Sequence, residues 1–157
     1  FSIGKPAIGL CFGGQLIANA LGAAVNTNQN QELGWMDVHK VKQQAVECFQ
    51  LPEKFNVMHW HRETFEIPKG AIHLEKNDVF RNQMYQIVKN VLGFQFHPEI
   101  TPESLTLFLN DDDELESFKG KYVQSEQQLK ITPKSSFHAG NLLLNRAIEY
   151  VLQDNYC

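Results

Sequence analysis

Short runs rich in apolar residues recur along this chain, and in other segments apolar residues recur at helical spacing. The strand-like segments are 7–10, 35–41, 55–60, 71–74, 84–88 and 92–97. Helical spacing covers 14–21, 101–109 and 141–153. Strand-sized runs interleaved with amphipathic helical segments predict an α/β fold.

Two of the predicted helices carry end signals. Thr101 before Pro102 is typical of an N-cap followed by a proline at the first helical position. Gly22 stands where the helix over 14–21 should end. In that helix we expect one apolar stripe to pack on the sheet, formed by Leu16, Ile17, Ala20 and Leu21.

The start of the first helix carries candidate chemistry. Gly9-Leu10-Cys11-Phe12-Gly13 follows the strand-like run 7–10 and has the pattern of a nucleophile elbow, in which small neighbours let the central side chain project above the sheet. A thiol at a helix N-terminus is favoured in its reactive thiolate form. Cys11 is therefore a candidate nucleophile, and a buried, inert cysteine is the alternative.

A candidate base lies at the end of the last strand-like segment. Strand alternation directs Phe94 and Phe96 to one face and Gln95 and His97 to the other. Glu99, two residues after His97, can reach back to the far imidazole nitrogen and hold its tautomer. Nucleophile, base and orienting carboxylate are thus all present at predicted strand ends.

These segments resemble the class I, or triad, glutamine amidotransferases. Residues 5–22 are similar to the family's nucleophile segment, and 93–99 to its His-Pro-Glu segment. Residues 32–35 and 59–68 are similar to stretches of the GMP synthase-like branch. The resemblance runs from about Gly4 to Leu109, and it implies a flavodoxin-like, three-layer fold with a mostly parallel central sheet and helices on both faces.

The resemblance also implies roles for individual residues. Cys11, His97 and Glu99 would be the catalytic triad, and the backbone amide of Phe12 would be an oxyanion donor. Gln15 would help to hold the substrate glutamine. The loop from Trp60 to Glu63 would lie beside the substrate, which makes His61 and Glu63 candidate binding residues, although the family more often has Gly-Asp where this chain has Arg62-Glu63.

The sequence offers only weak signals for a metal or another cofactor. His59 and His61 would share one face of a strand, a spacing that suits a metal, but further ligands would have to come from elsewhere. We therefore predict a metal-free pocket wall there and no cofactor. The acidic residues of segment 110–114 lack the calcium-loop pattern and are interpreted as solvated.

Composition narrows the class of protein. A chain of 157 residues with 43% apolar content is sufficient for one domain over residues 1–157. The net charge of −4 argues against nucleic acid as a partner, and no run reaches membrane-spanning length. Three scattered cysteines, Cys11, Cys48 and Cys157, fit a reducing compartment, so we predict a cytoplasmic protein.

The chain begins at Phe1, and an upstream Gly-rich loop that would supply a second oxyanion donor is not found. We therefore expect an N-terminally truncated domain that is a poor enzyme until its upstream segment is restored.

The predicted activity is hydrolysis of the glutamine side-chain amide through a γ-glutamyl thioester, with ammonia passed to a synthase domain or subunit. A γ-glutamyl peptidase or hydrolase, a catalytically silent regulatory module and a cysteine-elbow redox or chaperone protein are the alternatives.

Overall fold

The structure is a computed structural model that describes residues 5–42, 48–110, 115 and 117–153. Its strands are β1 (Ala7–Leu10), β2 (Val25–Lys40), β3 (Lys54–Phe65), β4 (Ile72–Lys76), β5 (Met84–Ile87) and β6 (Val91–Phe94). Its helices are α1 (Phe12–Ala20), α2 (Pro102–Leu109), α4 (Glu126–Lys130) and α5 (Lys134–Leu152). The predicted α/β composition is confirmed, with β2 and β3 longer than their apolar runs indicated.

The strands form one mixed sheet in the order β1-β6-β5-β4-β2-β3. Only β1 and β6 are parallel, whereas every other neighbouring pair of these strands is antiparallel. A mostly parallel sheet was therefore the wrong expectation for the described residues. The physical reason lies in the connections, because β5 and β6 are joined by a short turn at 88–90, which permits only antiparallel pairing.

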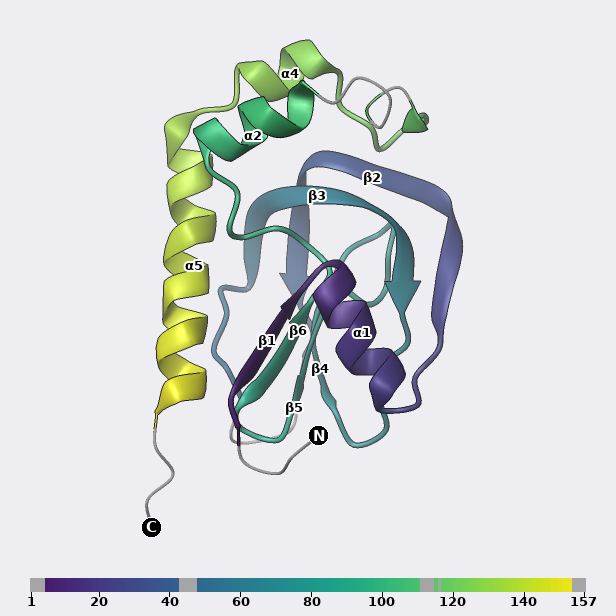
Figure 1. Ribbon diagram of the computed structural model, residues 1–157, viewed down its shortest axis with the longest axis vertical. Coiled ribbons are helices and arrows are strands. Elements are labelled where there is room, and N and C mark those ends of the chain that lie inside the picture. Colours follow the sequence, from purple (N-terminus) through teal and green to yellow (C-terminus); the bar gives the residue numbers. More distant parts are fainter. Residues whose placement is uncertain (1–4, 43–47, 111–114, 116, 154–157) are drawn as a thin grey trace.

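Helices cover both faces of the sheet, as predicted (Figure 1). Met84 and Leu92 belong to the core that includes Leu143 and Ala147 of α5. Tyr85, the next residue along β5, packs with Ala18 of α1 in another cluster. Because successive side chains of a strand point to opposite faces, α1 and α5 lie on opposite sides of the sheet.

Helix α1 packs only in part through the predicted apolar stripe, of which Ile17 joins a core cluster. Gly14, Gln15 and Ala18 are buried, whereas Leu16 is 53% exposed. A Cβ atom at Gly14 would stand 2.6 Å from the carbonyl oxygen of Phe94, so the helix backbone lies directly against β6. This close approach turns the helix away from the orientation that would bury Leu16.

The other predicted helices differ in how well their ends were located. Thr101 caps α2 as expected, its hydroxyl accepting a hydrogen bond from the Ser104 amide at 3.2 Å. Helix α5 begins at Lys134, earlier than the predicted 141. Most of the acidic segment 110–114 lies outside the described residues.

No helix in the described ranges has the length and apolarity needed to cross a membrane.

Strand β4 carries a buried carboxylate that lacks a hydrogen-bond partner among the described residues. Glu75 on β4 is fully buried, and neither of its carboxylate oxygens has a hydrogen-bond partner among the described residues. Burial raises the pKa of Glu75 to about 8, against the attraction of Lys40. The folded chain therefore holds a neutral Glu75 at neutral pH.

This burial predicts a pH-dependent stability. In the unfolded chain Glu75 loses its proton near pH 4.5, but in the folded chain only near pH 8, so stability should fall as pH rises between these values. Glu75→Gln should remove this loss, which is on the order of 3–5 kcal/mol. Thermal melts at pH 5 and pH 8 test it, with the exposed Glu149→Gln as control. A Glu75→Gln protein that keeps the parental pH dependence would contradict the prediction.

Candidate active site

Cys11 occupies a strained turn between β1 and α1. Its backbone angles are φ 47° and ψ −107°, in a region that costs a non-glycine residue on the order of 1–3 kcal/mol. A Cβ atom at Gly9 would lie 2.5 Å from backbone atoms of Gly13, so the return of the chain into α1 requires a glycine at position 9. Gly13 itself has open space at its Cβ position, so sterics explain only the first of the two predicted glycines.

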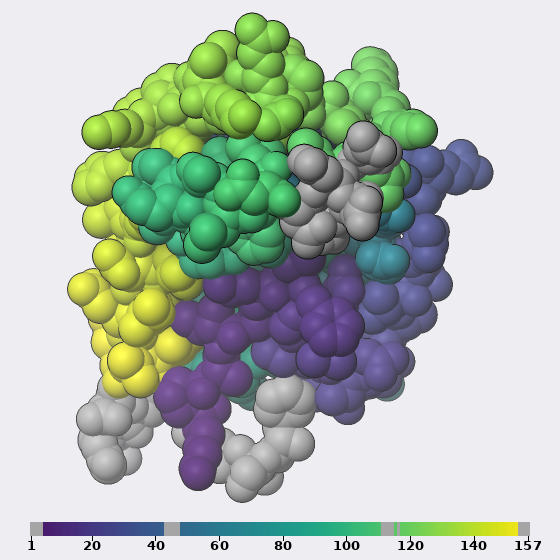
Figure 2. Space-filling model, turned by 45° about the horizontal axis from the view of Figure 1, so that its top comes forward, coloured from purple at the N-terminus to yellow at the C-terminus, as the bar shows by residue number. Residues whose placement is uncertain are grey.

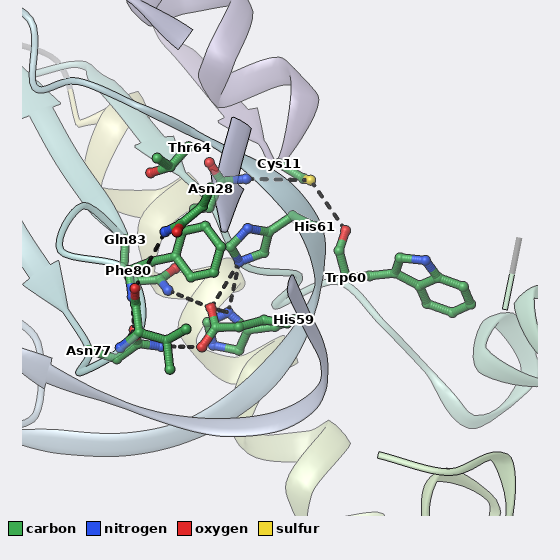
Figure 3. A network of polar contacts seen from close by, with 12 residues as sticks. Cys11, Asn28, His59, Trp60, His61, Thr64, Asn77, Phe80 and Gln83 are labelled. Atoms are coloured by element: carbon green, nitrogen blue, oxygen red, sulfur yellow. Dashed lines mark hydrogen bonds and ion pairs between the residues drawn. The ribbon is translucent and has the colours of Figure 1, made fainter. Parts of the chain in front are cut away.

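The Cys11 thiol lies against polar groups from β3 and from the segment that follows β6 (Figure 3). Its sulfur is 3.8 Å from the carbonyl oxygen of Trp60 on β3. The side-chain amide of Gln95, just after β6, donates to the sulfur at 3.6 Å. Gln15 of α1 in turn donates from Nε2 to Gln95 Oε1 at 3.3 Å, which orients that amide.

His97 and Glu99 form a second pair close to the thiol. Nδ1 of His97 lies 2.6 Å from Oε1 of Glu99, and the His97 backbone amide donates to the carbonyl of Met58 at 2.8 Å. Burial alone would lower the pKa of His97, but its interactions with Cys11 and Glu99 raise that pKa to about 10. The geometry therefore favours a protonated His97 at neutral pH.

The loop that carries His97 and Glu99 is fixed by α5. The side-chain amide of Asn141 donates to the carbonyl oxygens of Pro98 and Ile100, at 2.9 and 3.1 Å. A Cβ atom at Gly140 would stand 3.1 Å from the Pro98 oxygen, so the helix and the loop are in tight contact. Helix α5 thus holds the position of the imidazole relative to the sheet.

A pocket of about 220 Å³ opens over these groups. Its lining is Leu10, Cys11, Phe12, Met58, Trp60, His97, Ile100 and Phe108. Figure 2 shows the purple N-terminal segment and the green region of α2 meeting on one face of the molecule, in agreement with Phe12 and Phe108 lining one pocket. Cys11 and His97 are therefore accessible to a small molecule in the same cavity.

Comparison with known proteins identifies the family of this chain. The family profile for class-I glutamine amidotransferases matches residues 1–112. The chain belongs to this family. It is 32% identical to GMP synthase [glutamine-hydrolyzing] of Aquifex aeolicus over 107 residues, which are 64% of this chain and 20% of that protein. It is 30% identical to the putative glutamine amidotransferase-like protein YfeJ of Salmonella typhimurium over 132 residues, 80% of this chain and 54% of that protein.

Solved structures of glutamine amidotransferases share the fold. The Methylobacillus flagellatus protein aligns with a TM-score of 0.86 at 26% identity, over 94% of this chain and 62% of that chain. The Thermotoga maritima protein aligns with a TM-score of 0.79 at 26% identity, over 95% and 63%. These matches confirm the predicted amidotransferase fold. The chain spans less than two thirds of each of these relatives.

The predicted substrate-binding residues of this amidotransferase chain lie outside the pocket lining. Gln15 is buried, and its side chain bonds to Gln95, which in turn contacts the thiol. His61 is buried away from the pocket, and Glu63 is exposed. For His61 and Glu63 the reason is strand alternation. Met58 and Trp60 face the pocket from β3, so the side chains at positions 59, 61 and 63 point to the other face of the strand.

His61 instead joins a buried polar cluster with His59 and Glu32, defined here as the Glu32 cluster. Oε2 of Glu32 lies 3.2 Å from His59 Nδ1 and 3.1 Å from His61 Nε2. Burial alone would raise the pKa of Glu32, but His59 and His61 hold that pKa well below its usual value, while burial lowers the pKa of His61. These histidines are therefore not the pocket wall that the sequence suggested.

Two residues that take part in these polar contacts were not singled out from the sequence. Gln95 contacts the thiol, and its placement on the same strand face as His97 was the signal that could have found it. Glu32 begins the resembling segment 32–35, but its place opposite His61 follows only from the pairing of β2 with β3.

The geometry predicts a selectively reactive Cys11. A chloroketone analogue of glutamine should alkylate Cys11 and spare Cys48, which is 7% exposed in the core. His97→Ala should slow alkylation of Cys11 at pH 7 by at least about tenfold, because the imidazolium that stabilises the thiolate is lost. Mass spectrometry of the labelled peptides measures both. Equal labelling of the two cysteines in the folded protein, or an unchanged rate in His97→Ala, would refute the activated thiol.

Proposed function

We propose that this chain is a glutaminase that hydrolyses the side-chain amide of glutamine with Cys11, His97 and Glu99 as its triad. The observation that carries the proposal is one pocket into which a strained turn presents Cys11 and in which His97, paired with Glu99, meets it. Membership of the class-I amidotransferase family supports the choice of glutamine as substrate.

In the first step the Cys11 thiolate attacks the amide carbon of glutamine. The protonated ring of His97 stabilises the negative charge of that thiolate. Glu99 fixes the ring so that Nδ1 carries the hydrogen it shares with Oε1, which leaves the other ring nitrogen for the thiol and the substrate. The Gln95 amide stabilises the thiolate by donating to its sulfur.

The tetrahedral intermediate then develops negative charge on the former amide oxygen. The backbone amide of Phe12, the first residue of α1, is free of intrahelical bonding by its position in the helix and serves as an oxyanion donor. The orientation of the helix dipole adds to this stabilisation.

Collapse of the intermediate breaks the carbon–nitrogen bond. His97 gives its proton to the departing nitrogen, so ammonia leaves and a γ-glutamyl thioester remains on Cys11. His97 next takes a proton from water, the hydroxide equivalent adds to the thioester carbon, and glutamate leaves with regeneration of the thiolate and imidazolium. Atoms balance as glutamine plus water giving glutamate plus ammonia.

Fewer residues are proposed to bind the substrate glutamine than the sequence analysis named. Gln15 acts on the glutamine site indirectly, because it orients the Gln95 amide that contacts the thiol. The side chains of His61 and Glu63, the other predicted binding residues, do not line the pocket that holds Cys11. Since several relatives are named glutamine-hydrolysing GMP synthases, we propose that the ammonia is delivered to a synthase domain or subunit.

The triad predicts unequal effects of substitution on the full natural chain. Cys11→Ala and His97→Ala should each lower glutaminase kcat by at least about 1,000-fold, because each makes or breaks bonds. Glu99→Gln should leave a measurable fraction, because Glu99 orients and stabilises. Ammonia release is measured against Glu149→Gln, an exposed substitution on α5.

Two outcomes would contradict this account. A Cys11→Ala protein that releases ammonia at the parental rate would exclude covalent catalysis by this thiol. Turnover of γ-glutamyl dipeptides that exceeds that of glutamine would identify a γ-glutamyl hydrolase with the same triad.

A further inference from the structure

The Glu32 cluster has the composition and geometry of a metal site, and the proposed glutaminase chemistry does not use it. Its members are fully buried or nearly so, and they lie on the side of β3 that faces away from the thiol pocket. We propose that Glu32, His59 and His61 bind one divalent transition-metal ion, with Zn²⁺ as the fitting probe, in a closed structural site between β2 and β3.

Strand pairing brings the three side chains to one point. His59 and His61 are two residues apart on β3 and so share a face. Glu32 of β2 pairs directly with His61 across the antiparallel ladder, and directly opposed residues present their side chains on the same face. Figure 3 shows His59 and His61 directed into the same buried region. Two neighbouring strands thus supply a His-x-His pair and a carboxylate.

The spacing of the three atoms matches tetrahedral coordination. The distances are 3.2 Å between Glu32 Oε2 and His59 Nδ1, 3.1 Å between Oε2 and His61 Nε2, and 3.3 Å between the two nitrogens. Zinc bonds of about 2.0–2.1 Å at tetrahedral angles separate neighbouring ligands by roughly 3.3 Å. A metal ion can therefore meet all three atoms after adjustments of a few tenths of an ångström.

The hydrogen bond on the outer nitrogen of His61 also suits a metal ligand. Its Nδ1 lies 3.1 Å from the carbonyl oxygen of Glu63, which can only accept, so this nitrogen carries a hydrogen. In the tautomer with this single hydrogen, the Nε2 lone pair points toward Glu32 Oε2 and His59 Nδ1, which is the direction a metal ligand requires. A backbone carbonyl on the outer nitrogen is the usual second partner of a metal-bound histidine.

Neighbouring amides support the carboxylate and suggest a fourth ligand. Asn77 donates to Glu32 Oε1 at 2.6 Å, and Gln83 Nε2 donates to Oε2 at 2.9 Å. Gln83 is fully buried, and its Oε1 has no hydrogen-bond partner among the described residues. A half-turn of the Gln83 amide would give up the bond from Nε2 to Oε2 and place this oxygen beside Oε2, where it can bind the ion. Four protein ligands in a closed site are typical of structural zinc.

The test is metal binding by the full natural chain after removal of metals with a chelator. We expect one Zn²⁺ per chain by mass spectrometry of the metal content, and a rise in Tm on adding Zn²⁺. Glu32→Gln and His61→Gln should each weaken binding by at least about tenfold and abolish the rise in Tm. His39→Gln, a matched histidine change at the other end of the β2–β3 ladder, should retain both.

The Cys11 pocket is the competing location for an added ion, and a further variant separates the two sites. Cys11→Ser should still bind one Zn²⁺, because the thiol is not a ligand of the proposed site. Loss of binding in Cys11→Ser with retention in Glu32→Gln would overturn the proposal, as would no binding by the parent chain. Glutaminase assays on the same proteins report on the triad independently of this result.

Cobalt spectroscopy decides the question even if the core variants fail to fold. Co²⁺ added to the metal-free parent chain should give the intense visible bands of a tetrahedral site, without the near-ultraviolet charge-transfer band of a bound thiolate. A thiolate band, or the weak spectrum of hydrated Co²⁺, would contradict the Glu32 cluster as the site.

Discussion

The structure depends on the close approach of α1 to the parallel pair β1 and β6. Gly9 and Gly14 permit it, because a side chain at either position would collide with backbone. The turn that enters this helix forces Cys11 to a positive φ and projects its thiol above the sheet edge. β6 then delivers Gln95 and His97 to the same edge. The packing of α1 against β1 and β6 offsets the energetic cost of the strained backbone at Cys11.

Strand β3 links the two polar centres of the molecule. Met58 and Trp60 line the thiol pocket, and their carbonyl oxygens contact the His97 amide and the Cys11 sulfur. His59 and His61, at alternate positions, form the Glu32 cluster behind them. The side chains of the Glu32 cluster and the carbonyl groups that border the pocket therefore belong to the same stretch of β3, so an ion bound at the proposed metal site would also restrain those carbonyl groups.

Local signals in the sequence predicted the parts of this structure that depend on neighbouring residues. The cap of α2 at Thr101 and the facing of Phe94 and Phe96 into the core follow from spacing alone. The nearness of His97 to Glu99 follows in the same way. The strand directions and the buried face of α1 depend on which segments meet in space, and short-range periodicity does not encode that. The place of Glu32 opposite His61 is the same kind of long-range fact.

The most direct test of the account is to trap the covalent intermediate on the full natural chain. Protein mixed with glutamine and quenched in acid within the first turnover should show, by intact-mass spectrometry, a fraction heavier by one γ-glutamyl group. Peptide mapping should place that group on Cys11, and Cys11→Ala should show none. Glutamate and ammonia produced at full rate with no adduct at any quench time, or an adduct on another residue, would contradict a Cys11 thioester as the centre of this protein's chemistry.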